Sequence, residues 1–225
     1  MEQEKKTLQD LKSLSPEEFE RLERAKRHDE MGWYVLYVTA LHERQMLEAF
    51  TGKPDPYNRG GKSQRGSYAP LDPVIEAYVP IREEKRKWSD RVKVVPVVLT
   101  PGIVFVHIKL SERRRLYIND HVRSFLYNKD RKEPARISDA QMEAFRAMVS
   151  EGEDVSMITP VKGDTVQIIA GKFSGYVGEI VRVDGKNKFQ LRLNDFMAIT
   201  ISVDADNVKS VPKGSAIDYP DERFV

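Results

Sequence analysis

Apolar and polar positions follow different periods along the chain, and each period predicts a different element. Residues 32–40, GWYVLYVTA, are apolar at nearly every position, which is typical of a central strand covered on both faces. Residues 41–50 carry apolar side chains at helical spacing and predict a helix. Upstream, Ser15 precedes a proline and two acids, so we expect a charged helix to begin there.

The next periodic segments predict further strands and helices. Residues 74–81 alternate with a period of two and predict a strand, whereas residues 82–90 are polar and indicate a connection. Thr-Pro-Gly at 100–102 is a strong turn signal between two apolar runs, each of which predicts a strand. A short helix, an edge strand and a helix capped by Ser138 follow. Helices alternating with four or five strands indicate an α+β sandwich of about 120 residues.

Shifts in composition divide the chain into segments. Near the C-terminal end, strands of about five residues are broken by Gly, Asp and Asn, which is typical of a small all-β barrel. A long loop rich in Gly, Pro and Ser interrupts the first domain. We predict a charged helical extension at 1–30, the α+β domain at 31–150 with its loop at 51–73, a linker at 151–160, the all-β domain at 161–211 and a tail at 212–225.

Two glycine-containing stretches raise the question of a phosphate-binding loop. GGKS at 60–63 matches part of that motif, but Pro56 stands where the motif requires glycine, and neither the strand nor the helix of the motif is evident beside it. The glycines at 171, 175 and 178 are followed by a predicted strand, so their amides cannot lie at a helix N-terminus. Glycine also permits sharp bends and close backbone approach in a small barrel. We therefore reject nucleotide binding and assign these glycines to the barrel.

The net charge is only +2, but the charges are unevenly distributed. Residues 31–150 contain 21 Lys and Arg against 14 Asp and Glu, whereas the segments on either side are net negative. An excess of positive charge suits a polyanion or an acidic protein surface, and a solvated basic face is the alternative.

Several kinds of site are excluded by what the sequence lacks. There are no cysteines, which excludes disulfides and cysteine-ligated metals. The four histidines show no ligand spacing and no G-x-S-x-G occurs, so we expect no metal, no cofactor and no enzymatic activity. No apolar run approaches the ~20 residues that span a bilayer, and the charged N-terminus has no signal sequence. We therefore expect a cytoplasmic protein without a membrane partner.

The all-β domain resembles the KOW motif of transcription and ribosomal proteins. The matching positions are Gly163, Val166, Ile168, Gly171, Gly175, Gly178, Ile180 and Val181. The segments WYVLYVTALHERQMLEAF, WSDRVKVVPVVLTPGIVFVHI and RISDAQMEAF are similar in order and spacing to the N-terminal (NGN) domain of the NusG family. The resemblance spans residues 32–211 and implies an NGN-type sandwich with an antiparallel sheet, followed by an SH3-like KOW barrel. The loop and the N-terminal extension make the chain look like a specialised NusG paralogue that promotes read-through of long operons.

The resemblance implies a transcription elongation and antitermination factor without an active site. Such factors bind the clamp helices of RNA polymerase, bridge the DNA cleft and suppress pausing. By position, their hydrophobic contact surface corresponds to Tyr37, Pro101, Ile103 and Phe105. The alternative is that Tyr37 and Phe105 are core residues. Thr100 and Ile103 replace aromatic residues that are usual in the family, which reduces the aromatic surface.

Two groups of basic residues are candidates for further contacts. Arg113, Arg114 and Arg115 stand where some specialised members have His-Thr-Thr, and they would pair with acidic polymerase groups or DNA phosphates or form a solvated face. Trp88 would stack on a base or pack on a hairpin. The candidates for contact with upstream or non-template DNA are Arg82, Lys85, Arg86, Lys87, Arg91 and Lys93.

In the KOW domain, Phe173 and Phe196 lie on predicted loop tips. The family recruits a second partner there, either ribosomal protein S10 or the termination factor Rho. An antiterminator dedicated to particular operons would be expected to avoid Rho. The rival interpretation is a ribosome- or RNA-binding protein that joins a KOW barrel to an unrelated α+β domain.

Overall fold

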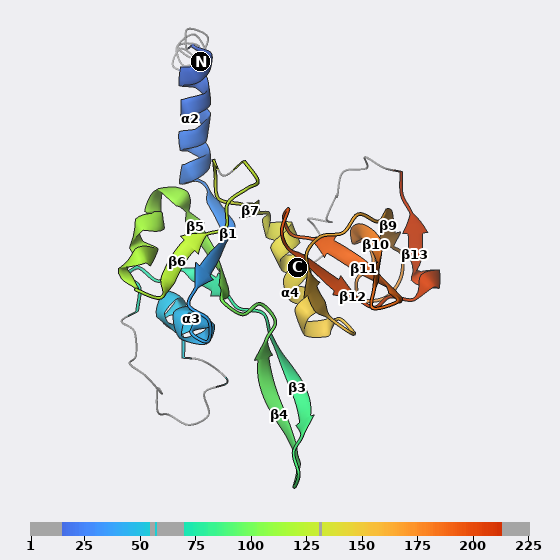
Figure 1. The fold of residues 1–225 in the computed structure, drawn as a ribbon. Coiled ribbons are helices and arrows are strands. Elements are labelled where there is room, and N and C mark those ends of the chain that lie inside the picture. The colour runs from blue at the N-terminus through green and yellow to red at the C-terminus, as the bar shows by residue number, and fades with distance from the viewer. Residues whose placement is uncertain (1–14, 55–56, 58–69, 131, 213–225) are drawn as a thin grey trace.

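The computed structural model describes residues 15–54, 57, 70–130 and 132–212. It contains a projecting N-terminal helix, an α+β domain, a long hairpin and an all-β domain, as Figure 1 shows. The predictions for residues 1–14, for most of the loop at 51–73 with its GGKS stretch, and for the tail beyond residue 212 lie outside the described residues. Among the described residues, no helix is long and apolar enough to cross a membrane.

An antiparallel five-stranded sheet forms the centre of the first domain, in the order β2-β5-β1-β6, with β7 also paired to β1. β1 is a central strand whose residues from Trp33 to Leu36 are buried, which confirms the prediction for this segment. The strands are β1 (Met31–Val38), β2 (Glu76–Tyr78), β5 (Ile103–Lys109), β6 (Val122–Phe125) and β7 (Arg136–Ile137).

Helices cover both faces of this sheet because the side chains of β1 alternate between them. Tyr34 and Leu36 pack with the 3₁₀ helix η1 (Leu110–Ile118) and helix α3 (Glu43–Thr51). Trp33 and Val35 point to the other face, where helix α4 (Asp139–Glu151) packs. The domain is therefore the α+β sandwich with an antiparallel sheet that was expected.

Two helices begin at the predicted serine caps. The Ser15 side chain accepts a hydrogen bond from the Glu18 amide at the start of α2 (Pro16–Asp29), and Glu18 bonds back to Ser15. Ser138 and Gln141 form the same reciprocal pair at the start of α4. Helix α2 projects from the body in Figure 1, and Arg24 fastens its C-terminal half through an ion pair of 3.0 Å with Glu133.

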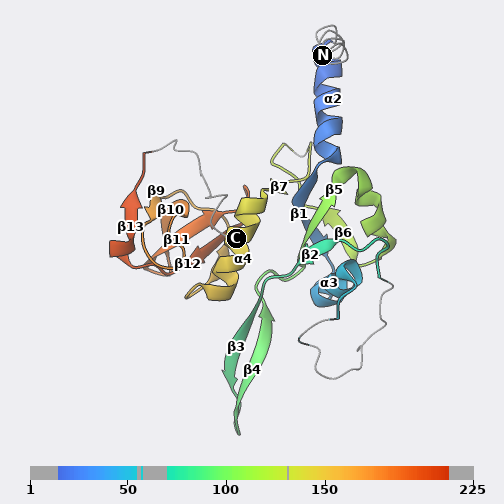
Figure 2. The ribbon, with the colours of Figure 1, turned by 180° about the vertical axis from the view of Figure 1, so that it is seen from behind.

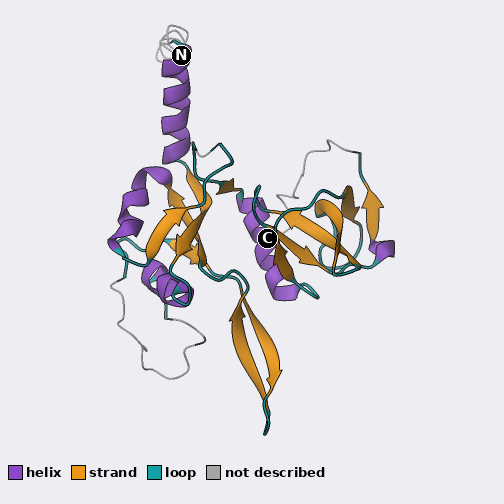
Figure 3. Cartoon of the chain, viewed as in Figure 1, coloured by secondary structure: helices purple, strands orange, loops and turns teal. Residues whose placement is uncertain are grey.

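The polar connection predicted at 82–90 is wrong, because most of it forms strand β3 (Ile81–Lys87). β3 pairs antiparallel with β4 (Val92–Val98) in a separate two-stranded sheet, shown in Figure 3. The ladder of backbone hydrogen bonds does not depend on side-chain polarity, and the valine-rich partner strand supplies the β propensity. The strand predicted at 74–81 is accordingly divided between β2 and β3.

The all-β domain is an antiparallel sheet in the order β13-β9-β10-β11-β12-β8. β8 lies inside the segment predicted as a linker at 151–160, so part of that segment belongs to the domain. Its strands are β8 (Ser156–Ile158), β9 (Asp164–Ile168), β10 (Val177–Val183), β11 (Lys186–Arg192), β12 (Ala198–Ile201) and β13 (Val208–Ser210), with the 3₁₀ turn η2 (Ala205–Asn207) before β13.

The structure shows why glycines occur at positions 171, 175 and 178, where the sequence raised the question of a phosphate-binding loop. A Cβ atom at Gly178 would lie 2.4 Å from the Gln190 carbonyl oxygen, so only glycine lets β10 approach β11 this closely. Gly171 and Gly175 have φ values of +83° and +97°, which shape the loop before β10. These glycines therefore allow close strand packing and a tight loop in the all-β domain, as the sequence predicts, and do not form a phosphate-binding loop.

The two domains pack against each other through α4, which lies between the two sheets in Figures 1 and 2. Phe145 and Ile199 belong to one hydrophobic cluster that spans both domains. The Gln141 side-chain amide donates to the Arg192 carbonyl at 3.1 Å. Gly152 marks the junction, because a Cβ there would lie 2.6 Å from a methyl group of Ile201.

Candidate partner-binding surfaces

Three of the residues predicted to contact RNA polymerase lie together where two neighbouring interior strands of the first sheet, β1 and β5, are joined side by side at their ends. Tyr37 is at the end of β1, and its side chain is 38% exposed. It is the register partner of Ile103 on β5, and the neighbouring Val38 amide donates to the Gly102 carbonyl at 2.9 Å. The exposed Pro101 begins this turn, so the turn lies directly beside Tyr37.

The prediction that Phe105 contributes to this surface is wrong. Its side chain is fully buried, with ring centres of Tyr78 and Phe145 at 6.3 and 5.2 Å. β5 is an interior strand, and α4 covers the face on which Phe105 lies. Burial in this aromatic cluster also raises the pKa of the Tyr78 hydroxyl to about 12, although nearby Arg146 opposes the shift.

Glu43 holds the turn in place, and the sequence did not single it out. Its buried carboxylate accepts hydrogen bonds from the amides of Leu41, at 3.1 Å, and Gly102, at 2.5 Å. This joins the loop after β1 to the Thr-Pro-Gly turn. Leu41 has φ +68° and is 89% exposed, an unfavourable combination of backbone conformation and apolar exposure. An acid in the first turn of a helix is too ordinary to reveal this role from sequence.

The three predicted arginines of η1 separate into two groups. Arg113 and Arg114 are exposed. Arg115 forms an ion pair of 2.5 Å with Glu112 and donates to the carbonyl of Pro73, so it joins η1 to the segment before β2. Because its guanidinium is already bonded to Glu112 and to the Pro73 carbonyl, Arg115 is a poor candidate for a contact with polymerase or DNA.

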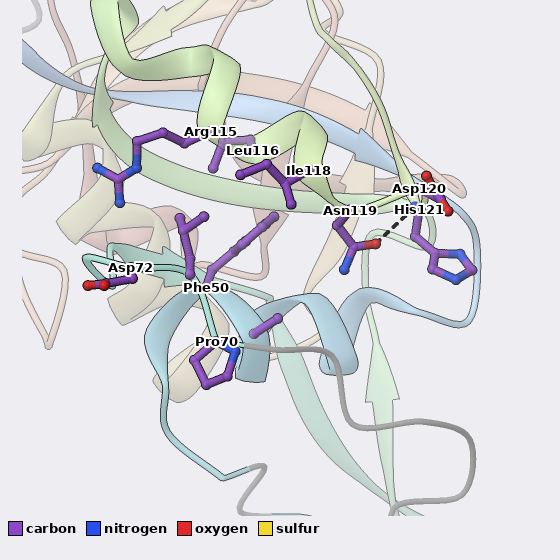
Figure 4. A pocket seen from close by; sticks show the side chains of 11 residues that line it. Phe50, Pro70, Asp72, Arg115, Leu116, Ile118, Asn119, Asp120 and His121 are labelled. Atoms are coloured by element: carbon purple, nitrogen blue, oxygen red, sulfur yellow. Dashed lines mark hydrogen bonds between the residues drawn. The ribbon is translucent and has the colours of Figure 1, made fainter.

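Arg115 lies at one end of a pocket of about 450 Å³ between α3 and η1. In Figure 4, Phe50 and Leu116 line its middle, and His121 lies at the far end. The ring of His121 stacks on His42, with centres 4.0 Å apart. Burial, and then the nearby His42 and Arg123, lower the pKa of His121 below its ordinary value of 6.5.

The basic residues of the hairpin also differ in what they contact. Arg82, at its base, donates to the Gly152 carbonyl at 2.9 Å, which assigns it a structural role in place of the predicted contact with nucleic acid. At the tip, Trp88 is 49% exposed, and the ammonium of Lys93 lies 5.1 Å from the centre of its ring. The remaining predicted residues are exposed along the hairpin: Lys85, Arg86, Lys87, Arg91 and Lys93.

The two aromatic candidates of the KOW domain have different surroundings. Phe173 is partly buried, with its ring centre 5.9 Å from that of Tyr176. Phe196 is 40% exposed. It lines a cavity of about 620 Å³ together with Tyr37 and Tyr127. Two residues predicted for different partners, Tyr37 and Phe196, therefore face the same cavity.

Comparison with known proteins identifies the family. A family model described as transcription termination factor nusG matches residues 31–146, and a KOW motif model matches residues 162–192. The chain is 24% identical over 174 residues to the transcription termination/antitermination protein NusG of Streptococcus pyogenes, covering 76% of this chain and 90% of that protein. The NusG of Lactococcus lactis is 21% identical over 188 residues, covering 81% and 94%. A solved structure titled "Domain interaction in Thermotoga maritima NusG" aligns with a TM-score of 0.43 at 19% identity, covering 82% of this chain and 99% of that one.

The first family model alone covers more than half of the chain, and it matches the α+β domain. The rival interpretation, in which an unrelated domain accompanies the KOW barrel, is therefore wrong. The chain belongs to the NusG family of transcription termination and antitermination factors, which are not enzymes.

Proposed function

We propose that this protein binds the clamp helices of RNA polymerase through Tyr37, Ile103 and the turn at Pro101, and that it suppresses pausing or termination on dedicated long operons. The observation that carries the proposal is the exposed Tyr37 ring beside a turn fixed by a buried carboxylate. An aromatic side chain on a rigid support loses little entropy on binding, which favours its use as an anchor. An exposed aromatic side chain beside a rigid turn suits the apolar side of a helix.

Nucleic acid and a second protein complete the proposal. The exposed arginines Arg113 and Arg114 would contact acidic polymerase groups or DNA phosphates. The exposed cations of the hairpin would contact upstream or non-template DNA. Phe196 would recruit ribosomal protein S10 or Rho, and Phe173 would contribute less because it is partly buried. The site of action is the cytoplasm, where bacterial polymerase works.

A binding experiment tests the polymerase surface. Core RNA polymerase is captured with the full chain and with Tyr37→Ala, and we expect the variant to bind at least about tenfold more weakly. Met31→Ala is the matched control, because Met31 is exposed to a similar degree but lies at the other end of β1 from Tyr37. Equal binding by Tyr37→Ala and the unaltered protein contradicts the proposed surface.

Transcription in vitro tests the activity. On a template with a pause site and a terminator, the protein should increase the fraction of full-length transcript, and Tyr37→Ala should not. An increase in termination by the unaltered protein contradicts antitermination while leaving polymerase binding intact.

A further inference from the structure

The pocket between α3 and η1, which Figure 4 shows from close by, has no part in the proposed contacts with polymerase and DNA. Its volume is about 450 Å³. Of the described residues that line it, none belongs to the surface around Tyr37 or to the β3–β4 hairpin. Small-molecule sites commonly have volumes of roughly 300–1,000 Å³, so the pocket is large enough for a ligand that the proposed function does not use.

Hydrogen bonds connect the walls of this pocket to one another. The Leu71 amide donates to the Ala49 carbonyl at 2.8 Å, which fastens the segment before β2 to α3. Arg115 joins the same segment to η1 through its hydrogen bond to the Pro73 carbonyl. A ligand would therefore enter a site whose walls are already in place, which lowers the entropic cost of binding.

Apolar side chains line the middle of the pocket. Phe50 faces it from α3 and Leu116 from η1, as Figure 4 shows. Ala49, Leu71 and Ile118 extend this apolar surface. Ile118 is a large aliphatic residue and is 81% exposed, so a bound apolar group would remove part of its surface from water. The lining therefore favours a ligand with an apolar body.

The charged groups of the pocket leave an excess of negative charge at its rim. Asp72 and Asp120 are exposed and lie at opposite ends in Figure 4. The Arg115 guanidinium is already paired with Glu112 at 2.5 Å, and the lowered pKa of His121 leaves its ring uncharged at neutral pH. No described cation lies at ion-pair distance from either aspartate. The two carboxylates therefore attract a cation and repel an anion.

We propose that this pocket binds a small amine with an apolar body, which lies between Phe50 and Leu116 while its ammonium group is held at the rim by the carboxylates. An ammonium group donates hydrogen bonds to carboxylate oxygens, and its positive charge offsets theirs. An apolar anion would meet two carboxylates, and a cation without an apolar body would leave the walls uncovered. The inference goes beyond the proposed function and does not depend on binding to polymerase.

Two probes with the same apolar body and opposite charge test the class of ligand. Phenethylamine and hydrocinnamate are each titrated into the isotope-labelled full chain, and NMR reports the affinity and the amide signals that shift. We expect the amine to bind with a Kd of about 1 mM, at least about fivefold more tightly than the carboxylate, and to shift signals of residues that line the pocket. Ethylamine, which lacks the ring, should bind at least about tenfold more weakly than phenethylamine.

Two variants test the location of the site. Ala49→Leu places a larger aliphatic side chain inside the cavity and should abolish binding of phenethylamine, while thermal denaturation shows whether the variant is folded. Ile118→Ser changes an exposed position, so the fold should tolerate it. It removes aliphatic surface from the rim and should weaken binding of phenethylamine about threefold.

A third variant tests the charge at the rim. Asp72→Asn combined with Asp120→Asn keeps the size of both side chains and should weaken binding of phenethylamine about fivefold. Asp184→Asn is the matched control, because Asp184 is exposed in the turn between β10 and β11 and asparagine tolerates its φ of +52°. The control should bind the amine as tightly as the unaltered chain.

Four results would overturn the proposal: no binding of phenethylamine up to about 10 mM, equal binding of phenethylamine and hydrocinnamate, unchanged affinity in both Ala49→Leu and Ile118→Ser, or shifted signals confined to residues outside the pocket. Tyr37→Ala should bind phenethylamine as tightly as the unaltered chain. If Tyr37→Ala also keeps its polymerase binding while the pocket variants lose the amine, only the polymerase surface is refuted.

Discussion

At the scale of single residues, the carboxylate of Glu43 has a large influence on the candidate polymerase surface. It is the acceptor for two backbone amides from segments that are 61 positions apart in the chain, those of Leu41 and Gly102. A buried amide without an acceptor costs about 1–3 kcal/mol, so this one side chain stabilises the turn beside Tyr37.

Glu43→Ala should therefore lower the free energy of unfolding by about 1–3 kcal/mol and weaken polymerase binding, because the turn loses its support. Urea denaturation measures the first effect. Glu48→Ala, one turn further along α3 and only partly buried, should change the stability by less than about 0.5 kcal/mol. Equal losses in the two variants would show that the carboxylate of Glu43 has no special role.

His121 gives the protein a dependence on pH. Because burial and neighbouring positive charge hold its folded-state pKa below 6.5, the unfolded chain binds more protons than the folded chain in mildly acidic solution. Stability should be complete above pH 6.5 and should decrease as the pH falls below that value towards the folded-state pKa. Thermal denaturation across this range should show the decrease, and His121→Gln should reduce its slope. An identical slope in the variant contradicts this assignment.

Residue types alone could not decide which predicted contact residues are exposed. Ile103 and Phe105 are two positions apart on one strand and therefore share a face of the sheet, as the alternating pattern predicts. Phe105 lies under α4, whereas Ile103 is the first residue of β5 and is only partly buried. The point at which α4 stops covering the sheet is a property of tertiary packing, and no local pattern encodes it.

At the scale of elements, local sequence signals predicted where helices begin better than they predicted which segments form strands. Both serine caps were correct because a cap depends only on residues within one helical turn. The prediction for residues 82–87, REEKRK, is wrong because their strand conformation depends on hydrogen bonds to a partner strand, which polar side chains do not reveal. The pattern of apolar and polar residues predicts a strand well only where at least one face of that strand packs against a hydrophobic core, as in β1 but not in β3.

The cap of α4 offers a test at this scale. Ser138→Ala removes the acceptor for the Gln141 amide and should cost about 1 kcal/mol, equivalent to a decrease in Tm of roughly 2–4 °C for a chain of this size. Ser150→Ala at the other end of the same helix is the control, because its hydroxyl is exposed and bonds only to the preceding turn. Similar Tm values for the two variants would show that the cap contributes little.

At the scale of the whole molecule, the sequence indicated two domains but not their contact. Helical spacing places Met142, Phe145 and Val149 on one apolar face of α4, and the buried residues of this helix also include Ala144 and Met148. A face this wide meets two partners, the sheet of its own domain and β12 of the KOW domain. The spacing of apolar residues along a helix indicates how wide its apolar face is, but it does not indicate which elements pack against that face.

Gly152→Ala should loosen this contact. The backbone of Gly152 has φ −68° and ψ 147°, which alanine adopts without strain, so the obstacle is the space taken by Ile201, Val155 and the Met148 carbonyl. Small-angle scattering should report a larger radius of gyration. Gly171→Ala, which meets no atom within 4 Å, should change local stability but not the radius. No expansion in Gly152→Ala would mean that the junction absorbs the methyl group.

The bond between Arg82 and Gly152 has a mechanical consequence. The hairpin extends roughly 20 Å from Arg82 to its tip, at about 3.3 Å per residue, and its root is tied to the residue where the domains meet. A force applied at Trp88 is therefore transmitted along the hairpin and through the bond from Arg82 to Gly152. It acts on the contact between the two domains, about 20 Å from the point at which it is applied.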